Sequence, residues 1–440
     1  MFPRVLLPTD FSPHAARTAG CIAEVPGIGE LVLLHVLEAG PDGEERRGQH
    51  TIEDRIRKAL EGLNGLKREI GRPGLPVRVL VHERVRDDVA GTILSVAASE
   101  KADLIAIGAR GMTLKSLFLG SVSSAVIRGA KTGILVVHDR VLESGGALGK
   151  YCESAFARIL APVDFSKPSL EMAASLPRLA GGGTAILLHI LPGDLPGRDI
   201  PLARTSAEKR LGELAAALER DGFRARTRIG TGDPAAGILR VAAEEDATIV
   251  VLPRFGKKEY VQAVGIGGTA AEVAAKARVP VLVGNPPVRL EVVTRELAAG
   301  EFPIAEEIWL RYHEIRPDPS SDRIFATFAD GVPAGVARCR RHPDGLEADG
   351  VFTLEEFRNR GYARRTVEAL VQACGGEALH LHSTLELVPF YRTLGFEPIP
   401  ETDLPPTIRE RYSFAMGDLG MAGVQPMRRP AGGRRREPAG

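Results

Sequence analysis

A chain of 440 residues is too long for one ordinary globular core, because domains cluster near about 100 to 150 residues. With 44% hydrophobic and 26% charged residues, the composition excludes a disordered or fibrous chain. A formal net charge of +1 excludes a whole-protein field that gathers nucleic acid or anionic membrane, so neither partner is expected. Length therefore suggests about three domains, and the basic residues have to be interpreted locally.

The N-terminus reaches Asp10 before any apolar stretch long enough for a signal peptide, and no run of about 18 apolar residues occurs. We therefore expect a cytoplasmic protein. The four cysteines form no CxxC pair, so neither a metal site nor a disulfide framework is expected, and all four are interpreted as thiols: Cys21, Cys152, Cys339 and Cys374.

The first part of the chain contains an internal repeat. The stretch "RVLLPTDFSPHAARTA" from Arg4 returns as "RILAPVDFSKPSLEMA" from Arg158. The same offset aligns His35 with His189, each in an apolar strand, where packed core histidines are expected rather than ligands. The sequence thus predicts a duplicated unit, with copies at 1–140 and 156–285 and a Gly-rich linker at 141–155.

Each copy alternates short β-branched runs with Ala- and Leu-rich stretches at helical spacing. This alternation predicts an α/β fold, a doubly wound parallel sheet with helices on both faces. Ligands of such sheets bind beyond the carboxyl ends of the strands. Two segments of the first copy occupy that position, "LLPTDFS" at 6–12 and "AIGARG" at 106–111.

A glycine loop, "GARGMTLKSLFLGS" at 108–121, follows an apolar strand and leads into a helix. Glycines let backbone N–H groups close on phosphate oxygens, and a helix N-terminus adds donors and partial positive charge. Together with Asp10 at the end of the first strand, the loop resembles the universal stress protein family, whose nucleotide-binding members use G-x2-G-x9-G-(S/T). Here eight residues, not nine, separate Gly111 from Gly120, so the loop is one residue tighter.

The resemblance implies an adenine nucleotide alpha hydrolase-like fold for both copies, with ATP or another adenine nucleotide in the first. Asp10 has a second interpretation as the N-terminal cap of the following helix, because Ser12 and Pro13 come just behind it. The family's contacts carry over to Pro8, Asp10 and Val36 for the adenosine and to Gly108, Gly111, Gly120, Ser121 and Val122 for the phosphates.

The second copy departs from this pattern. Pro253 replaces the first glycine, and ten residues separate Gly256 from Gly267. Proline lacks an N–H donor and has a fixed φ, so the phosphate-facing turn cannot form in the same way. Asp164 and Gly232 still fit the family. We expect a structural copy that pairs with the first within the chain, with a homo-oligomer left open.

A third, unrelated unit begins near Val288, with a helical segment and then antiparallel-looking strands around an Asp-Gly turn in "RIFATFADGVPAGVARCRR". Beyond Asp418 the chain is rich in Gly, Pro and Arg. The sequence predicts a domain at 288–418 and a disordered basic tail at 419–440.

The third unit contains "RNRGYARR" at 358–365, a tight turn before an amphipathic helix. Its R-x-x-G-x-A spacing matches the signature of the GNAT superfamily of acyl-CoA-dependent N-acyltransferases, which it resembles closely. Downstream, "FYRTLGF" at 390–396 matches the family's F-Y-x-x-x-G-F pattern. The Asn that members often carry ahead of that helix is absent, with Leu385 there. The resemblance implies an α/β domain with a mixed, mostly antiparallel sheet.

Acetyl-CoA is the implied cosubstrate. Backbone groups around Phe352, Thr353 and Leu354 would pair with the pantetheine amides, where two parallel strands splay apart. The loop would hold the pyrophosphate through small residues, N–H groups and arginines. Its predicted contacts are Arg358, Asn359, Arg360, Gly361, Tyr362, Ala363 and Arg364.

Three side chains are candidates for the chemistry. Tyr391 matches the tyrosine that lies near the CoA sulfur in many members and would be the general acid, or else packs beside Phe390 and Phe396. Glu347 and Asp349 precede the turn, where some members place a glutamate, and are candidates for the base or for solvated, substrate-orienting groups.

The leading hypothesis is an acetyl-CoA-dependent N-acetyltransferase, acting on an amine of a protein lysine or a small molecule, with a tandem module that binds an adenine nucleotide and regulates it. The alternative is a nonenzymatic sensor or scaffold that binds nucleotide and acyl-CoA. An independent ATPase is less favoured, because no water-activating carboxylate and metal set surrounds residues 108–121.

Overall fold

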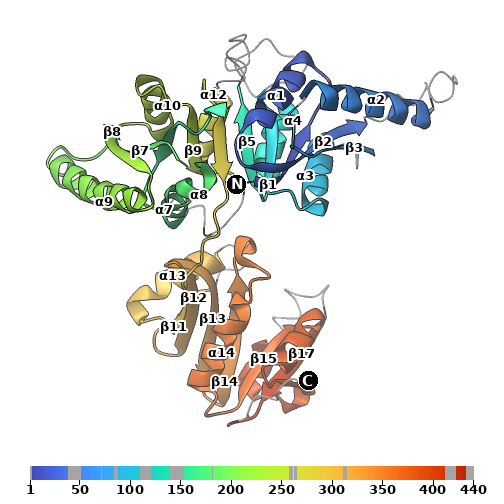
Figure 1. The fold of residues 1–440 in the computed structure, drawn as a ribbon. Coiled ribbons are helices and arrows are strands. Elements are labelled where there is room, and N and C mark those ends of the chain that lie inside the picture. The colour runs from blue at the N-terminus through green and yellow to red at the C-terminus, as the bar shows by residue number, and fades with distance from the viewer. Residues whose placement is uncertain are drawn as a thin grey trace. The chain divides into compact units, whose positions relative to one another are not determined.

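The computed structural model describes residues 2–37, 51–70, 72–83, 88–109, 120–138, 153–180, 182–256, 261, 265–310, 315–411 and 423–432 (Figure 1). The chain divides into two compact units, residues 1–288 and 289–440. No helix among the described residues combines the length and the apolar character needed to cross a bilayer.

The first half of unit 1 alternates strands and helices. The elements are β1 (Phe2–Pro8), α1 (Pro13–Glu24), β2 (Ile28–Leu37), α2 (Ile52–Ile70), β3 (Val77–Glu83), α3 (Val89–Ser99), β4 (Leu104–Gly108), α4 (Ser121–Gly129) and β5 (Gly133–Val137). The strands β1, β2, β4 and β5 are buried in their centres, which accounts for continuous apolar runs such as that of β1, whereas the edge strand β3 is half-buried or exposed throughout.

The second half repeats this order. Its elements are β6 (Arg158–Pro162), α7 (Lys167–Ala174), α8 (Leu176–Ala180), β7 (Thr184–Leu191), α9 (Ile200–Arg220), β8 (Arg224–Thr231), α10 (Pro234–Glu244), β9 (Ile249–Pro253), α12 (Gly268–Lys276) and β10 (Val281–Gly284). The strand orders, β3-β2-β1-β4-β5 and β8-β7-β6-β9-β10, are parallel and doubly wound within each half. The fold predicted for both copies is confirmed.

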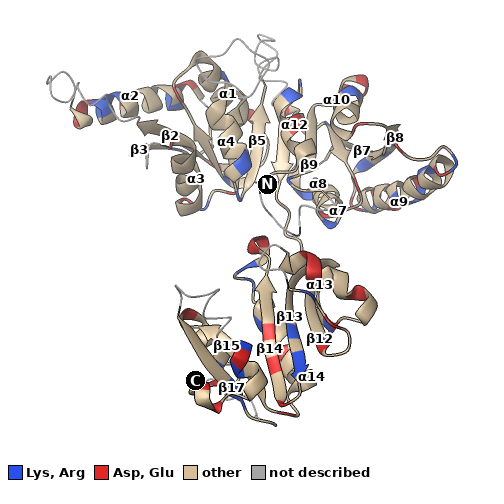
Figure 2. Cartoon of the chain, turned by 180° about the vertical axis from the view of Figure 1, so that it is seen from behind, with Lys and Arg blue, Asp and Glu red and all other residues tan. Residues whose placement is uncertain are grey.

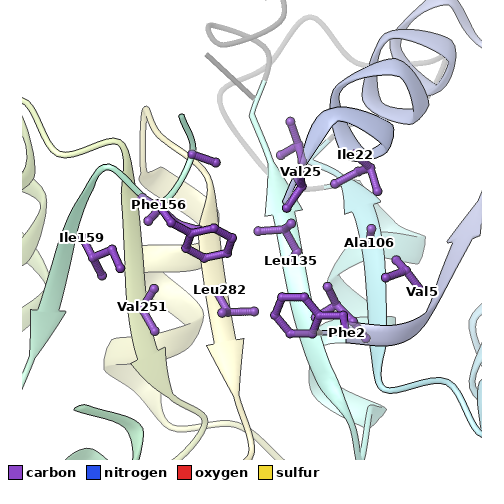
Figure 3. Packing of buried hydrophobic residues seen from close by; sticks show 14 of the residues in the cluster. Phe2, Val5, Ile22, Val25, Ala106, Leu135, Phe156, Ile159, Val251 and Leu282 are labelled. Atoms are coloured by element: carbon purple, nitrogen blue, oxygen red, sulfur yellow. The ribbon is translucent and has the colours of Figure 1, made fainter. Parts of the chain in front are cut away.

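The two copies join edge to edge in one ten-stranded sheet. Strand β5 pairs antiparallel with β10, with Leu135 opposite Leu282. Figure 3 shows these side chains beside Phe156 and Val25, so that apolar residues of both copies form one cluster. The pairing predicted within the chain is confirmed. It also explains why copies expected as separate domains form a single compact unit, since each covers the other's sheet edge.

Unit 2 contains a mixed sheet, and its first helical segments lie between β11 and β12 in the chain. Its elements are β11 (Val292–Glu296), the 3-10 turn Ala299–Glu301, α13 (Phe302–Trp309), β12 (Asp322–Ala329), β13 (Val332–His342), β14 (Gly345–Thr353), the 3-10 turn Glu355–Phe357, α14 (Tyr362–Cys374), β15 (Leu379–Thr384), the 3-10 turn Leu385–Leu387, α15 (Val388–Arg392), β16 (Glu397–Pro398), the 3-10 turn Glu401–Asp403 and β17 (Val424–Arg429). In the order β11-β12-β13-β14-β15-β17-β16, only β14 and β15 are parallel neighbours. The mixed, mostly antiparallel sheet is as predicted.

Two sequence-based expectations need correction. The tail predicted as disordered contains β17, which lies between β15 and β16, with Met427 fully buried opposite Leu381. The composition is misleading because the strand is short and its apolar residue is surrounded by Gly, Pro and Arg. The expectation of four thiols is wrong for Cys21, which is disulfide-bonded. Spacing along the chain does not reveal a pairing that tertiary structure makes.

Candidate functional sites

The residues predicted to contact adenosine lie at one edge of the first sheet. Pro8 ends β1, and Val36 is buried near the end of the neighbouring β2. The N–H of Thr9 donates to the carbonyl of Leu34 at 2.8 Å, which continues the β1–β2 pairing to the loop. Asp10 follows and is exposed. The parallel strands thus bring Pro8, Asp10 and Val36 to the carboxyl edge, where such sheets bind ligands.

The turn after β1 is held by local hydrogen bonds. Ser12 is the cap of α1, accepting from the N–H of Ala15, so the interpretation of Asp10 as that cap is wrong. Asp10 instead accepts from the N–H of Ser12 at 3.0 Å. Between them Phe11 has a left-handed φ of 61°, and its ring lies 4.4 Å from that of His35. The strained turn holds the Asp10 carboxylate just beyond the strand.

His35 is half-buried, and its Nδ1 lies 2.9 Å from the carbonyl oxygen of Thr9. His189 repeats this arrangement 2.7 Å from the carbonyl of Val163, and its ring lies against Phe165. Both histidines therefore brace the turn after the first strand of their copy. They are packing residues, as predicted, although neither is fully buried.

The two ends of the predicted phosphate loop meet. The N–H of Gly120 donates to the carbonyl of Ala109 at 3.0 Å, and Ser123 Oγ donates to that of Gly108 at 2.9 Å. A side chain at Gly108 would place its Cβ 2.7 Å from His14 Nε2, so a larger residue there would require the His14 ring to move. Ser121 and Val122 are exposed in the first turn of α4, and Gly111 lies outside the described residues.

The second copy keeps this closure but fills the position with a large side chain. Gly267 N–H donates to the carbonyl of Arg254, as Gly120 does to Ala109. The Arg254 side chain is 4% exposed, and it donates to the carbonyls of Gly265 and, across the seam, Arg128. Burial lowers the pKa of its guanidinium. Arg254 therefore links the two copies.

A cavity of about 180 Å³ lies at the carboxyl edge of the second copy. Asp164, His189, Pro253, Arg254 and Thr269 contribute to its lining, and most other lining residues are apolar. Its volume is close to that of a cavity that holds a single aromatic ring. The position matches the adenosine end of the first copy, with Pro253 in place of the first loop glycine and with Gly256 and Gly267 also in the lining.

In unit 2, the predicted CoA loop has two left-handed residues. Asn359 has φ 62° and Gly361 has φ 78°, and Gly361 is the N-cap of α14 with no capping side chain. The turn therefore leaves the first N–H groups of α14 free of a side-chain cap. Arg358 and Arg360 are exposed, whereas Arg364 donates to Thr393 Oγ1 at 2.9 Å.

Beside this loop, strand β14 separates from β15. Their ladder contains the pairs Leu346–Leu379 and Glu347–His380, and the described residues of β14 after Glu347 pair only with β13. At the far end of β14, the N–H of Leu354 donates a hydrogen bond to the carbonyl of Ala334. The Thr353 Oγ1 atom is buried and has no hydrogen-bond partner among the described residues. Phe352 and Thr353 thus border an open strand edge, the geometry that accepts an extended ligand.

Charged side chains gather where the two strands begin to separate. Figure 2 shows acidic residues on β14 beside basic residues on β13. Asp349 accepts from Arg338 at 2.5 Å and from Arg411 at 2.8 Å. The fully buried carboxylate of Asp322 accepts from Arg338 and Arg340. The four strands β12 to β15 contribute to this charge network.

Glu347 lies at its centre. The carboxylate contacts His342 Nε2 at 2.9 Å, Arg411 Nε at 2.9 Å and His382 Nδ1 at 3.4 Å. Burial opposes its ionisation, but hydrogen bonds from His342 and His382 and the charge of Arg411 outweigh burial and hold its pKa well below the ordinary 4.5. So acidic a carboxyl is a poor base. The ion pairs of Glu347 and Asp349 favour an orienting role over their candidacy as the base.

Tyr391 is buried in α15. Its ring makes edge contacts with Phe390 at 5.0 Å and Phe396 at 6.0 Å. The packing interpretation of Tyr391 thus describes its ring, which such contacts orient. The hydroxyl stays the predicted general acid.

A model of the universal stress protein family matches residues 1–138 and 155–284, more than half of the chain. The chain belongs to the universal stress protein family. A universal stress protein of Thermus aquaticus is 36% identical over 141 residues, which are 31% of this chain and 99% of that protein. The crystal structure of a universal stress protein from Archaeoglobus fulgidus matches 64% of this chain and 98% of its own, at 24% identity and a TM-score of 0.48.

This universal stress protein also carries an acetyltransferase (GNAT) domain, whose family model matches residues 293–396. The crystal structure of the ribosomal-protein-S18-alanine N-acetyltransferase from Escherichia coli matches 34% of this chain and 99% of its own, at 16% identity and a TM-score of 0.25. Both resemblances inferred from the motifs are confirmed.

Sequence inspection missed three residues of the acetyltransferase domain, His342, His382 and Arg411. Each contacts Glu347 from a different segment. The alternation in "LHLHST" places His380 and His382 on one face of β15, and this pattern could have marked His382 as a candidate site residue. Nothing in the sequence pairs Arg411 with a residue 64 positions earlier.

Proposed function

We propose that this protein is an acetyl-CoA-dependent N-acetyltransferase whose first universal stress protein copy binds an adenine nucleotide and regulates acetyl transfer to an amine. The observation that carries the enzyme proposal is the open edge of β14 next to the left-handed turn at the start of α14. That turn and edge fit the pyrophosphate and the pantetheine amides of one molecule.

The cosubstrate would supply an activated acetyl group as a thioester. The amine nitrogen attacks the thioester carbonyl carbon, the carbon–sulfur bond breaks, the amine loses a proton and the departing thiolate gains one. Tyr391 is the proposed proton donor to the sulfur. Arg358 and Arg360, both exposed at the loop, would contact phosphate oxygens.

His382 is the proposed base. It lies on β15 beyond the last β14–β15 pair, and its Nδ1 faces the carboxylate of Glu347. A carboxylate on one ring nitrogen fixes the tautomer and orientation of the imidazole, so that the other nitrogen can accept a proton from the amine. In this arrangement Glu347 orients His382, and Arg411 and His342 keep Glu347 ionised.

The nucleotide proposal rests on the first copy. Asp10 and Val36 share an edge with the closed ends of the glycine loop, Gly108 and Gly120, at the point where the strand order reverses. An adenosine group would lie by the strand ends and phosphates by the N-terminus of α4.

The test measures thiol release from acetyl-CoA by the full chain with a panel of amines, with and without ATP or cyclic AMP. Release that depends on an amine, and that Tyr391→Phe lowers about 100-fold in kcat, supports the enzyme. A nucleotide effect that Asp10→Ala removes supports regulation. CoA binding without release from any amine would instead favour the acyl-CoA-binding sensor.

A further inference from the structure

Unit 2 contains a pair of buried thiols that the proposed acetyl transfer does not use. Cys339 lies on β13, and Cys374 is the last residue of α14. Both residues are buried, at 2% and 6% exposure, and belong to the same hydrophobic cluster. Both are free cysteines. The helix and the strand therefore bring the two cysteines into one buried cluster at the wall of one cavity.

A second observation is the cavity beside them, whose two arginines each form an ion pair, Arg323 with Glu296 at 2.7 Å and Arg341 with Glu377. A cavity of about 180 Å³ is lined by both cysteines, by Arg323 and Arg341, and by the acidic Glu377. Arg323 Nη1 donates to Cys374 Sγ at 3.5 Å. Arg341 forms an ion pair with Glu377 at 2.6 Å, which holds its guanidinium at the cavity. A small polar oxidant can enter such a cavity, and a guanidinium beside sulfur stabilises the thiolate, the reactive form of cysteine.

We propose that Cys374 and Cys339 form a peroxide-reactive thiol pair, with Cys374 as the attacking thiolate and Cys339 as the thiol that resolves it into a disulfide. This site is separate from the acetyl-transfer chemistry and does not depend on it. The two roles differ because Arg323 donates to the sulfur of Cys374, whereas no described hydrogen bond joins Arg323 to the sulfur of Cys339.

The electrostatics agree with these roles. The hydrogen bond from Cys339 lowers the pKa of Cys374 against the opposing effect of burial, with Arg323 and Arg341 adding to the lowering and Glu296 opposing it. The same hydrogen bond raises the pKa of Cys339, with burial acting in the same direction. Oxidation of Cys374 removes the thiolate that retains the Cys339 proton, so Cys339 becomes easier to deprotonate when it is needed.

The reaction balances with hydrogen peroxide as the oxidant. The Cys374 thiolate attacks one peroxide oxygen, the O–O bond breaks, and hydroxide leaves, so that Cys374 becomes a sulfenic acid. The Cys339 sulfur then attacks Cys374 Sγ, the S–O bond breaks, and the second oxygen leaves as water with the Cys339 proton. Two thiols lose two electrons and peroxide becomes two water molecules. The product would tether the end of α14 to β13.

The test treats the full chain with a small excess of hydrogen peroxide and maps the peptides by mass spectrometry. A peptide pair linked through Cys339 and Cys374 is expected. Cys339→Ser should stop at a sulfenic acid on Cys374 that dimedone traps, and Cys374→Ser should leave Cys339 reduced. Peptide mapping separates both signals from Cys21 and Cys152.

Arg323→Gln tests the cationic contribution, with Arg295→Gln as its matched control because Arg295 also forms an exposed ion pair but does not line the cavity. Arg323→Gln should slow oxidation about threefold to tenfold, while Arg295→Gln should not. A thermal scan of each variant establishes folding. The proposal is overturned if folded wild-type protein keeps both thiols reduced, or if Cys374 oxidises without a link to Cys339.

Discussion

At the scale of single residues, Glu347 illustrates how an ordinary carboxylate acquires its role from its contacts. The depressed pKa means that its ionised form is stabilised by folding. That contribution is fully present above about pH 4.5, the ordinary value, and is lost as the pH falls toward the lower folded value. Acid should therefore weaken unit 2 partly through this one side chain.

We predict that Glu347→Gln destabilises the protein by about 3 to 5 kcal/mol near neutral pH, because it leaves the buried charge of its partners uncompensated. The loss should shrink below about pH 4.5, where the carboxyl of the unfolded chain begins to bind a proton that the folded carboxyl does not yet bind. Denaturant unfolding across pH measures both effects. Glu386→Gln, at an exposed position, is the control, and an equal loss at every pH would contradict the prediction.

The two histidines at Glu347 permit a second prediction. His382→Gln should lower kcat about 100-fold, because the proposed base is removed. His342→Gln loses a comparable contact to the same carboxylate, at 2.9 Å, but lies on β13 away from the separating strands. Steady-state kinetics of both variants distinguish catalysis from support of Glu347, and equal effects on kcat would count against His382.

At the scale of elements, the start of α14 joins a strained turn to an open helix end. Asn359 and Gly361 are both left-handed, and Arg360 lies between them. A Cβ at Gly361 would meet no atom within 4 Å, so substitution there acts through backbone strain and ligand approach rather than a clash.

We predict that Gly361→Ala costs about 1 to 2 kcal/mol and weakens acetyl-CoA binding about tenfold, because the turn opens or the Cβ faces the pyrophosphate. Gly376→Ala, just beyond the other end of α14 and also without a neighbour within 4 Å, is the matched control. Equilibrium binding of CoA and thermal unfolding provide the measurements. Unchanged affinity in a folded Gly361→Ala protein would show that the turn does not hold the phosphates.

At the scale of whole units, the duplicated module is one sheet with two unequal ligand edges. The first copy closes its loop with Ala109, while the second places the buried Arg254 there and bonds it to the first copy through Arg128. The second loop thus contributes to the seam between the copies, and its cavity has Pro253 where the first copy has Gly108. The two copies therefore share a fold, but their ligand-binding edges differ.

We predict that ATP binds with a stoichiometry of one per chain. Asp10→Ala should weaken binding at least tenfold, whereas Asp164→Ala, its counterpart in the second copy, should leave the affinity unchanged. Isothermal titration calorimetry on the full chain measures both quantities. Two equivalents in the wild-type protein, or equal losses in the two variants, would show that the second copy also binds the nucleotide.

The sequence alone determined the duplicated doubly wound halves, the acetyltransferase fold and the placement of their loops, because strand and helix periodicity and glycine turns are local properties of the chain. Tertiary structure alone decided the rest. Three features join residues that are distant in the sequence. They are the pairing of β5 with β10, the position of β17 in the sheet of unit 2, and the contacts of Glu347 with His342, His382 and Arg411. Burial and charge pairing depend on neighbours in space, so the role of a carboxylate cannot be assigned until those neighbours are known.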